Sequence, residues 1–198
     1  MHEKLPSIYL ARHGETAWSL TGQHTGLSDI PLTERGERNA VRLGERLRGI
    51  TFAAVFSSPL QRARRTCELA GYGGVARVDP DLVEWNYGDY EGLRTAEIHQ
   101  RDPGWNVFRE GGPHGETVAD VSGRADRVVA RVREIQGCVL VFSSGHFLRA
   151  LAARWVGLPV ACGQYLALDT AALSIVGYEH GRDRPVIRLW NDTGHVLI

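Results

Sequence analysis

The residues Arg12-His13-Gly14-Glu15-Thr16 directly follow the apolar run Ile8-Tyr9-Leu10-Ala11, and this junction sets the expected architecture. The run is rich in β-branched and aromatic side chains, which predicts a short buried strand. Open α/β sheets bind their ligands at the edge formed by the carboxyl ends of the strands. Arg12 and His13 end the predicted strand, so we expect a guanidinium and an imidazole at this edge. Gly14 has no Cβ and allows a turn directly after His13. On its own, the pattern also fits an ordinary core or surface histidine.

Two later stretches repeat this form. Residues 52–56 and 138–142 are apolar runs typical of buried strands, and polar residues follow each of them. Helices are expected after both, over about 60–70 and 147–156. Alternation of strand and helix predicts a mainly parallel sheet with helices on both faces.

The remaining patterns complete a three-layer α/β sandwich. Thr33 is the expected N-cap of a helix that reaches about residue 48, and apolar residues spaced by three and four predict a helix over 116–135. The runs 172–178 and 185–190 predict an antiparallel hairpin at a sheet edge. We expect one domain over residues 1–198, a loop without regular structure over 15–32, and an inserted flap at about 93–115.

Composition excludes several classes of protein. Lys plus Arg and Asp plus Glu both number 23, so the net charge is zero and neither a nucleic acid nor a membrane surface is an expected partner. The three cysteines have no Cys-x-x-Cys spacing, which argues against a disulfide framework and a structural zinc site and favours the cytoplasm. No apolar run approaches the ~18 residues of a membrane span. A small-molecule ligand and a monomer or homodimer are expected.

The predicted strand ends bring together groups that suit a phosphate. They supply Arg12-His13, then Ser57-Ser58 with Arg62, and finally Ser144-Gly145-His146 with Arg149. Arginine forms two parallel, charge-assisted hydrogen bonds with a phosphoryl group. The ordinary alternatives are a solvated helix face for Arg62 and a helix cap for His146.

In order and spacing, four segments resemble the histidine phosphatase superfamily, which includes cofactor-dependent phosphoglycerate mutases. The segments are 12–16, 57–63, 84–92 and 144–149. Within the superfamily the chain looks most similar to the branch typified by sedoheptulose-1,7-bisphosphatase, through residues 16–27, 84–92 and 105–117.

The resemblance implies a two-step phosphoryl transfer that needs neither a metal nor a cofactor. His13 would attack phosphorus and form a phosphohistidine. Arg12 and Arg62 would hold the equatorial oxygens, and Glu84 would act first as general acid and then as general base.

The resemblance also implies a set of substrate-binding residues. Arg149 would contact the sugar or a second phosphate. The full set is Ser19, His24, Thr25, Gly26, Ser58, Tyr87, Ser144, Gly145, His146 and Arg149.

One position departs from the family pattern. The family carries a second histidine directly before a glycine, whereas this chain has Ser144 before Gly145. Ser144 could donate a hydroxyl hydrogen bond, His146 could swing in as a substitute, or the protein could be a weakly active or inactive phosphosugar-binding homologue. The expected function is a phosphatase acting on phosphate monoesters, with sugar phosphates favoured and a phosphoglycerate mutase as an alternative.

Overall fold

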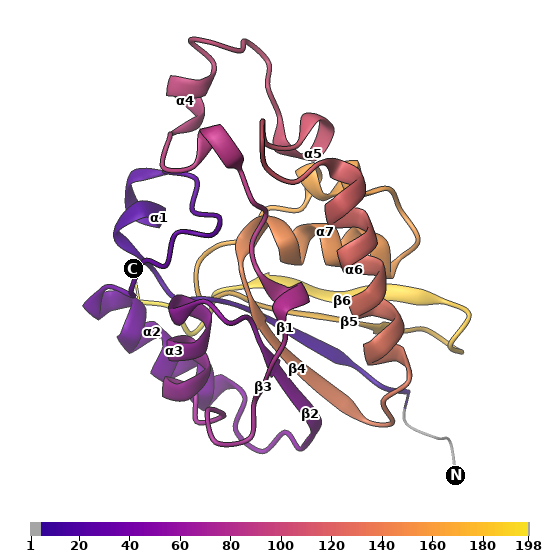
Figure 1. Cartoon of the computed structure of the whole chain (residues 1–198). Coiled ribbons are helices and arrows are strands. Elements are labelled where there is room, and N and C mark those ends of the chain that lie inside the picture. Colours follow the sequence, from indigo (N-terminus) through magenta and orange to yellow (C-terminus); the bar gives the residue numbers. More distant parts are fainter. Residues whose placement is uncertain (1–4, 198) are drawn as a thin grey trace.

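A six-stranded sheet of order β3-β2-β4-β1-β5-β6 forms the centre of the computed structural model, which describes residues 5–197 (Figure 1). Strands β1 to β4 are parallel, β5 is antiparallel to β1, and β6 is antiparallel to β5. The mainly parallel sheet and its edge hairpin are therefore confirmed. The strands are β1 (Ile8–Arg12), β2 (Phe52–Ser57), β3 (Arg77–Val78), β4 (Cys138–Ser143), β5 (Leu173–Tyr178) and β6 (Pro185–Asp192).

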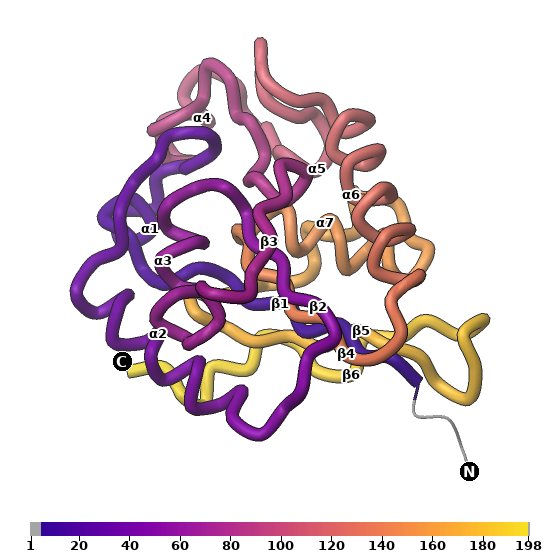
Figure 2. The backbone as a smooth tube through the Cα atoms, turned by 60° about the horizontal axis from the view of Figure 1, so that its bottom comes forward, coloured from indigo at the N-terminus to yellow at the C-terminus, as the bar shows by residue number. Residues whose placement is uncertain are grey.

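Helices cover both faces of the sheet. Figures 1 and 2 show α2 (Glu34–Arg46) and α3 (Gln61–Leu69) on one face, and α6 (Val118–Arg133) and α7 (Gly145–Trp155) on the other. The short elements are α1 (Ala17–Thr21), η1 (Pro80–Leu82), η2 (Gly88–Tyr90), α4 (Thr95–Ile98), α5 (Val107–Glu110) and η3 (Val160–Tyr165). No helix in the part of the chain described here is both long and apolar enough for a membrane crossing.

The strands divide their side chains between two hydrophobic cores. Leu10 packs in the core under α6 and α7, while its neighbour Ala11 packs in the core under α2 and α3. On β4, Val141 faces the first core and Leu140 and Phe142 face the second. Successive side chains of a strand point to opposite faces, so continuous apolar runs match a sheet that is covered on both sides.

The register of the central strands brings their carboxyl ends to one level. Arg12 pairs with Ser143, and Ser57 pairs with Phe142. Just beyond the strand ends, the amide of His13 donates to the carbonyl of Ser143 at 3.0 Å. The three polar stretches that follow β1, β2 and β4 therefore lie at the same edge, as the sequence pattern predicts.

Some segments differ from the prediction. The loop over 15–32 contains α1, because the Thr16 hydroxyl caps the amide of Ser19 while the Ser19 hydroxyl binds the amide of Thr16. Helix α7 begins at Gly145 instead of residue 147, which places His146 in its first turn. The flap region contains two short helices, α4 and α5.

Two glycines allow α2 to pack directly on the turn that carries His13. A Cβ built on Gly36 would lie 2.2 Å from the carbonyl oxygen of Glu15, and one on Gly14 would lie 2.5 Å from the carbonyl oxygen of Gly36. Both neighbours are backbone atoms, so the contact leaves no room for a side chain. The position of His13 thus depends on backbone-to-backbone packing.

Replacing Gly36 by alanine should lower the free energy of unfolding by about 1–3 kcal/mol, because the new methyl group overpacks this contact. Urea unfolding measures the change. The matched control is Gly123→Ala in α6, where the nearest atom to a new Cβ is 3.9 Å away. Alanine has the higher helix propensity, so the control should gain up to about 1 kcal/mol. Equal stability of the two variants would contradict the packing argument.

Candidate active site

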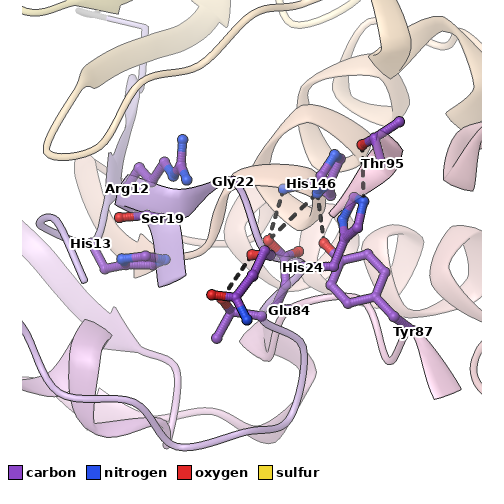
Figure 3. A pocket seen from close by; sticks show the side chains of 11 residues that line it. Arg12, His13, Ser19, Gly22, His24, Glu84, Tyr87, Thr95 and His146 are labelled. Atoms are coloured by element: carbon purple, nitrogen blue, oxygen red, sulfur yellow. Dashed lines mark hydrogen bonds and ion pairs between the residues drawn. The ribbon is translucent and has the colours of Figure 1, made fainter. Parts of the chain in front are cut away.

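A cavity of about 270 Å³ opens beyond the carboxyl end of β1 (Figure 3). Figure 3 shows Arg12 and His13 on one side of Glu84 and the group of His24, Tyr87 and His146 on the other. The lining residues are Arg12, His13, Ser19, Gly22, Gln23, His24, Thr25, Glu84, Tyr87, Thr95 and His146.

The imidazole of His13 is held in one tautomer. Its Nδ1 lies 2.7 Å from the carbonyl oxygen of Gly14. A carbonyl oxygen only accepts hydrogen bonds, so Nδ1 carries the hydrogen and Nε2 keeps its lone pair. His13 can therefore act as a nucleophile through Nε2.

The surroundings of His13 also favour its neutral form. The side chain is buried, and burial together with the positive charges of Arg62 and Arg12 holds its pKa well below the ordinary value of a histidine. A neutral imidazole is the form that can attack phosphorus.

The two guanidiniums near His13 are held by backbone carbonyl groups. Nη1 of Arg12 donates to the carbonyl of Leu168 at 2.5 Å. Arg62 is fully buried and donates to the carbonyls of Ser28, Thr25 and Gly26 at 2.8 to 3.1 Å. Within residues 5–197 neither arginine has a carboxylate partner, and the Nε atoms of both are buried without a hydrogen-bond partner. Buried charges are normally paired, so this positive charge fits an anionic ligand.

Glu84 is buried and fixed by three backbone amides. One carboxylate oxygen accepts from Trp85 at 2.9 Å and from Phe147 at 2.7 Å, and the other accepts from His146 at 2.9 Å. Two of these amides belong to the first turn of α7, where helices bind negative groups.

A second set of bonds holds the segment that carries Glu84. Arg124 of α6 donates to the carbonyls of Asp81, Val83 and Glu84 at 2.8, 2.7 and 3.3 Å. The hydroxyl of Ser143 donates to the carbonyl of Leu82 at 2.7 Å. Elements on both sides of the segment thus fix the position of Glu84.

The side of the main cavity opposite His13 is formed by three aromatic side chains, those of His24, Tyr87 and His146. The hydroxyl of Tyr87 lies 2.6 Å from Nδ1 of His146, and Nε2 of His24 lies 3.2 Å from the hydroxyl of Thr95. The rings of His24 and Tyr87 are 4.8 Å apart, and those of His24 and His146 are 5.8 Å apart. Burial lowers the pKa of His24 to about 4, so this histidine is neutral near pH 7.

A smaller outer cavity of about 140 Å³ lies on the other side of His24 and His146 and shares both with the main cavity. Arg149 lines it, with Nε donating to the carbonyl of Gly163 at 3.0 Å and Nη2 donating to that of Gln164 at 3.1 Å. Its guanidinium lies 4.6 Å above the ring of Phe108. Arg149 is therefore held in place at the end of the site farther from His13.

The structure brings most of the predicted site residues together. Those that line the main cavity are Arg12, His13, Ser19, His24, Thr25, Glu84, Tyr87 and His146, while Arg149 lines the outer cavity. Arg62 is fully buried and lines neither cavity, but its charge acts on His13.

Four predicted binding residues do not line either cavity. Gly26 donates its amide to the carboxylate of Glu91 at 2.8 Å, and the hydroxyl of Ser58 accepts a long bond of 3.4 Å from the amide of Leu60. Gly145 lies under the guanidinium of Arg12, since a Cβ there would be 3.1 Å from Cζ. The fourth is Ser144, whose buried hydroxyl has no partner among the described residues.

Several lining residues were not predicted from the sequence. Gly22 and Gln23 belong to a segment that carries the family resemblance, and their position beside His24 could have indicated them. Trp105 and Phe108 likewise belong to a segment that carries the resemblance, whereas Thr95 lies outside these segments and has no such signal. Among the residues that the structure describes, no group of three or more His, Cys, Asp or Glu side chains could hold a metal ion.

A neutral imidazole beside two guanidiniums without carboxylate partners, at the edge of a mainly parallel sheet, defines an α/β enzyme that acts on phosphate esters. The family model of the histidine phosphatase superfamily (branch 1) matches residues 8–193. The chain belongs to this superfamily, which confirms the resemblance and the assignment as a phosphoric monoester hydrolase.

Known proteins of this type are similar over most of their length. An acid phosphatase from Mycobacterium tuberculosis is 44% identical over 193 residues, which cover 95% of this chain and 93% of the relative. Sedoheptulose 1,7-bisphosphatase from Saccharomyces cerevisiae is 37% identical, with coverage of 78% and 69%. The solved structure of an open reading frame product from Mycobacterium tuberculosis has a TM-score of 0.93 and 42% identity, with coverage of 97% and 100%. These matches confirm the fold class.

The low pKa of His13 predicts that its ring gains a proton only at a pH well below the ordinary value of a histidine, which is about 6.5. NMR of protein labelled at histidine Cε1 measures this, and the His13→Gln variant identifies the signal. Because the folded state resists protonation at His13, the nucleophile should remain available in acid. A titration of this signal with a midpoint near the ordinary value would contradict the prediction.

Proposed function

We propose that the protein is a metal-independent phosphatase that hydrolyses phosphate monoesters through a phosphohistidine on His13. The observation that supports this most strongly is the lone pair on His13 Nε2 next to two guanidiniums that lack carboxylate partners. The lone pair supplies the nucleophile, and the guanidiniums supply charge that complements a phosphoryl group.

In the first step, Nε2 of His13 attacks phosphorus and the bond between phosphorus and the ester oxygen breaks. Glu84 gives a proton to the departing oxygen, and the alcohol leaves. In the second step, a water molecule attacks the phosphohistidine, Glu84 takes a proton from the water, and the bond between phosphorus and Nε2 breaks. Inorganic phosphate is released and His13 is again neutral. Arg12 and Arg62 stabilise the charge that spreads over the equatorial oxygens in both steps.

Sugar phosphates are the proposed substrates. The similarity to a sedoheptulose 1,7-bisphosphatase supports this class, and so does the outer cavity, where Arg149 lies beside the amides of Asn106 and Gln164. Amide groups suit hydroxyls, and a guanidinium suits either a hydroxyl or a second phosphate.

A weakly active phosphosugar-binding protein is the second candidate, because Ser144 stands where the family carries a histidine. The hydroxyl of Ser144 is fully buried and cannot replace the charge of an imidazolium. His146 is the other histidine nearby, but its Nδ1 lies at hydrogen-bond distance from Tyr87.

Release of phosphate from p-nitrophenyl phosphate and from a panel of sugar phosphates tests the proposed activity. The wild-type protein should release phosphate, and His13→Ala should release none above background because it lacks the nucleophile. Rapid mixing with ³²P-labelled substrate and an alkaline quench should show label bound to the wild-type protein alone. Binding of phosphosugars without turnover would favour the second candidate, and isomerised phosphoglycerate would favour a mutase.

Replacing Ser144 by histidine should raise kcat roughly tenfold to a hundredfold, because it restores a charge-assisted donor beside the phosphoryl group. Steady-state kinetics with p-nitrophenyl phosphate measures the change, and Ser144→Ala serves as the control that adds no donor. A Ser144→His variant that melts at the temperature of the wild type yet turns over no faster would show that the second imidazole is dispensable here.

A further inference from the structure

The pair formed by Tyr87 and His146 has no part in the two steps above. Its two members are 59 positions apart in the sequence, and the Tyr87 hydroxyl lies 2.6 Å from Nδ1 of His146. Tyr87 is almost completely buried, and burial together with the charge of Glu84 raises its pKa well above the ordinary value of a tyrosine. The phenol therefore keeps its hydrogen.

The hydrogen of this phenol determines the tautomer of His146. Among the described residues, Nδ1 of His146 is the one hydrogen-bond partner of the Tyr87 hydroxyl, so donation to Nδ1 leaves no hydrogen of the phenol unused. A neutral imidazole whose Nδ1 accepts a bond carries its own hydrogen on Nε2. His146 thus has the tautomer opposite to that of His13.

The Nε2–H group of His146 is available to a ligand. Among the described residues, the contacts of this ring with Tyr87 and, at 4.0 Å, with the carboxylate of Glu84 are both made through Nδ1, and the His146 side chain is 25% exposed. The ring lines both the main cavity and the outer cavity, and it lies beyond Glu84 as seen from His13. A group bound between the two cavities would meet this donor.

The ring is also held in an uncharged state. Burial and the positive charge of Arg149 keep the pKa of His146 well below the ordinary value. An uncharged N–H group binds neutral acceptors such as hydroxyl and ring oxygens, whereas the cations Arg12 and Arg149 at the two ends of the site suit anions.

We propose that His146 is a specificity-determining residue whose Nε2–H group donates to an oxygen of the alcohol part of the substrate, and that Tyr87 is the positioning residue that fixes this tautomer. The inference rests on the proposed phosphatase function. It adds a requirement to the proposed substrate class, namely sugar phosphates with an uncharged acceptor oxygen close to the phosphate.

The tautomer can be measured without any substrate. In protein labelled with ¹⁵N-histidine, the His146 signals should show an unprotonated Nδ1 and a protonated Nε2, and the His146→Gln variant assigns them. The Tyr87→Phe variant should lose this single tautomer. Tyr165→Phe is its matched control, because Tyr165 is 76% exposed and lines neither cavity. A wild-type protein with the hydrogen of His146 on Nδ1 would overturn the proposal.

Kinetics tests the contact with the alcohol. For a sugar monophosphate, His146→Phe should lower kcat/KM about tenfold, mainly through KM, because it removes one donor from a bound hydroxyl. For phenyl phosphate, which has no such oxygen, the change should stay below about twofold. The amide of His146→Gln can replace Nε2–H, so this variant should recover most of the loss with the sugar phosphate.

The outcomes separate this inference from the proposed function. If His13→Ala loses activity toward all esters but His146→Phe affects sugar and phenyl phosphates equally, the proposed role of His146 is overturned. The proposed phosphatase function then still stands. Absence of hydrolysis in the wild-type protein would instead defeat the proposed function, and the inference that depends on it would fail with it.

Discussion

The site depends on one constraint, two guanidiniums without a carboxylate partner, of which that of Arg62 is fully buried and that of Arg12 partly buried. Folding removes much of the hydration of these side chains, and the backbone carbonyls of Leu168, Thr25, Gly26 and Ser28 replace only part of it. Their positive charge therefore remains directed at His13, whose pKa it lowers together with burial. The same charge that complements a phosphoryl group also keeps the nucleophile in its neutral form. The rigid surroundings make this possible, because the His13 turn packs on α2 through glycine backbones and the Glu84 segment is held by Arg124 and Ser143.

The fold could be predicted from the sequence because its strands and helices are marked by short apolar patterns and caps within each element. Apolar runs on β1 and β4 match a sheet buried on both faces, and Thr33 and the apolar spacing of α6 mark two of the helices. The location of the site could be predicted as well. Parallel strands end at the same edge of the sheet, so polar residues that directly follow them lie close together there. The short helix α1 escaped prediction because its Thr16 and Ser19 cap lies in a segment with few apolar residues.

The site was predictable only in part. Sequence order indicates that Arg12, His13, Glu84 and His146 share a cavity, but it does not show which way a side chain points. Ser58 and Ser144 follow strands in the expected way, yet both are fully buried and neither lines a cavity. The bond between Tyr87 and His146 and the contribution of the flap residues depend on contacts between distant segments, for which a single sequence gives no periodic or spacing signal.

The two histidines of the site show how neighbours of different chemistry give one residue type two roles. A backbone carbonyl faces Nδ1 of His13, so the hydrogen must sit on Nδ1 and the lone pair on Nε2 is left for attack. A phenol faces Nδ1 of His146, so the hydrogen belongs on Nε2 and the ring offers a donor. Both rings are kept neutral by burial and by nearby arginines. His146 therefore differs from His13 in what it offers a ligand, because its acceptor atom already faces Tyr87 and its remaining N–H group suits an uncharged oxygen.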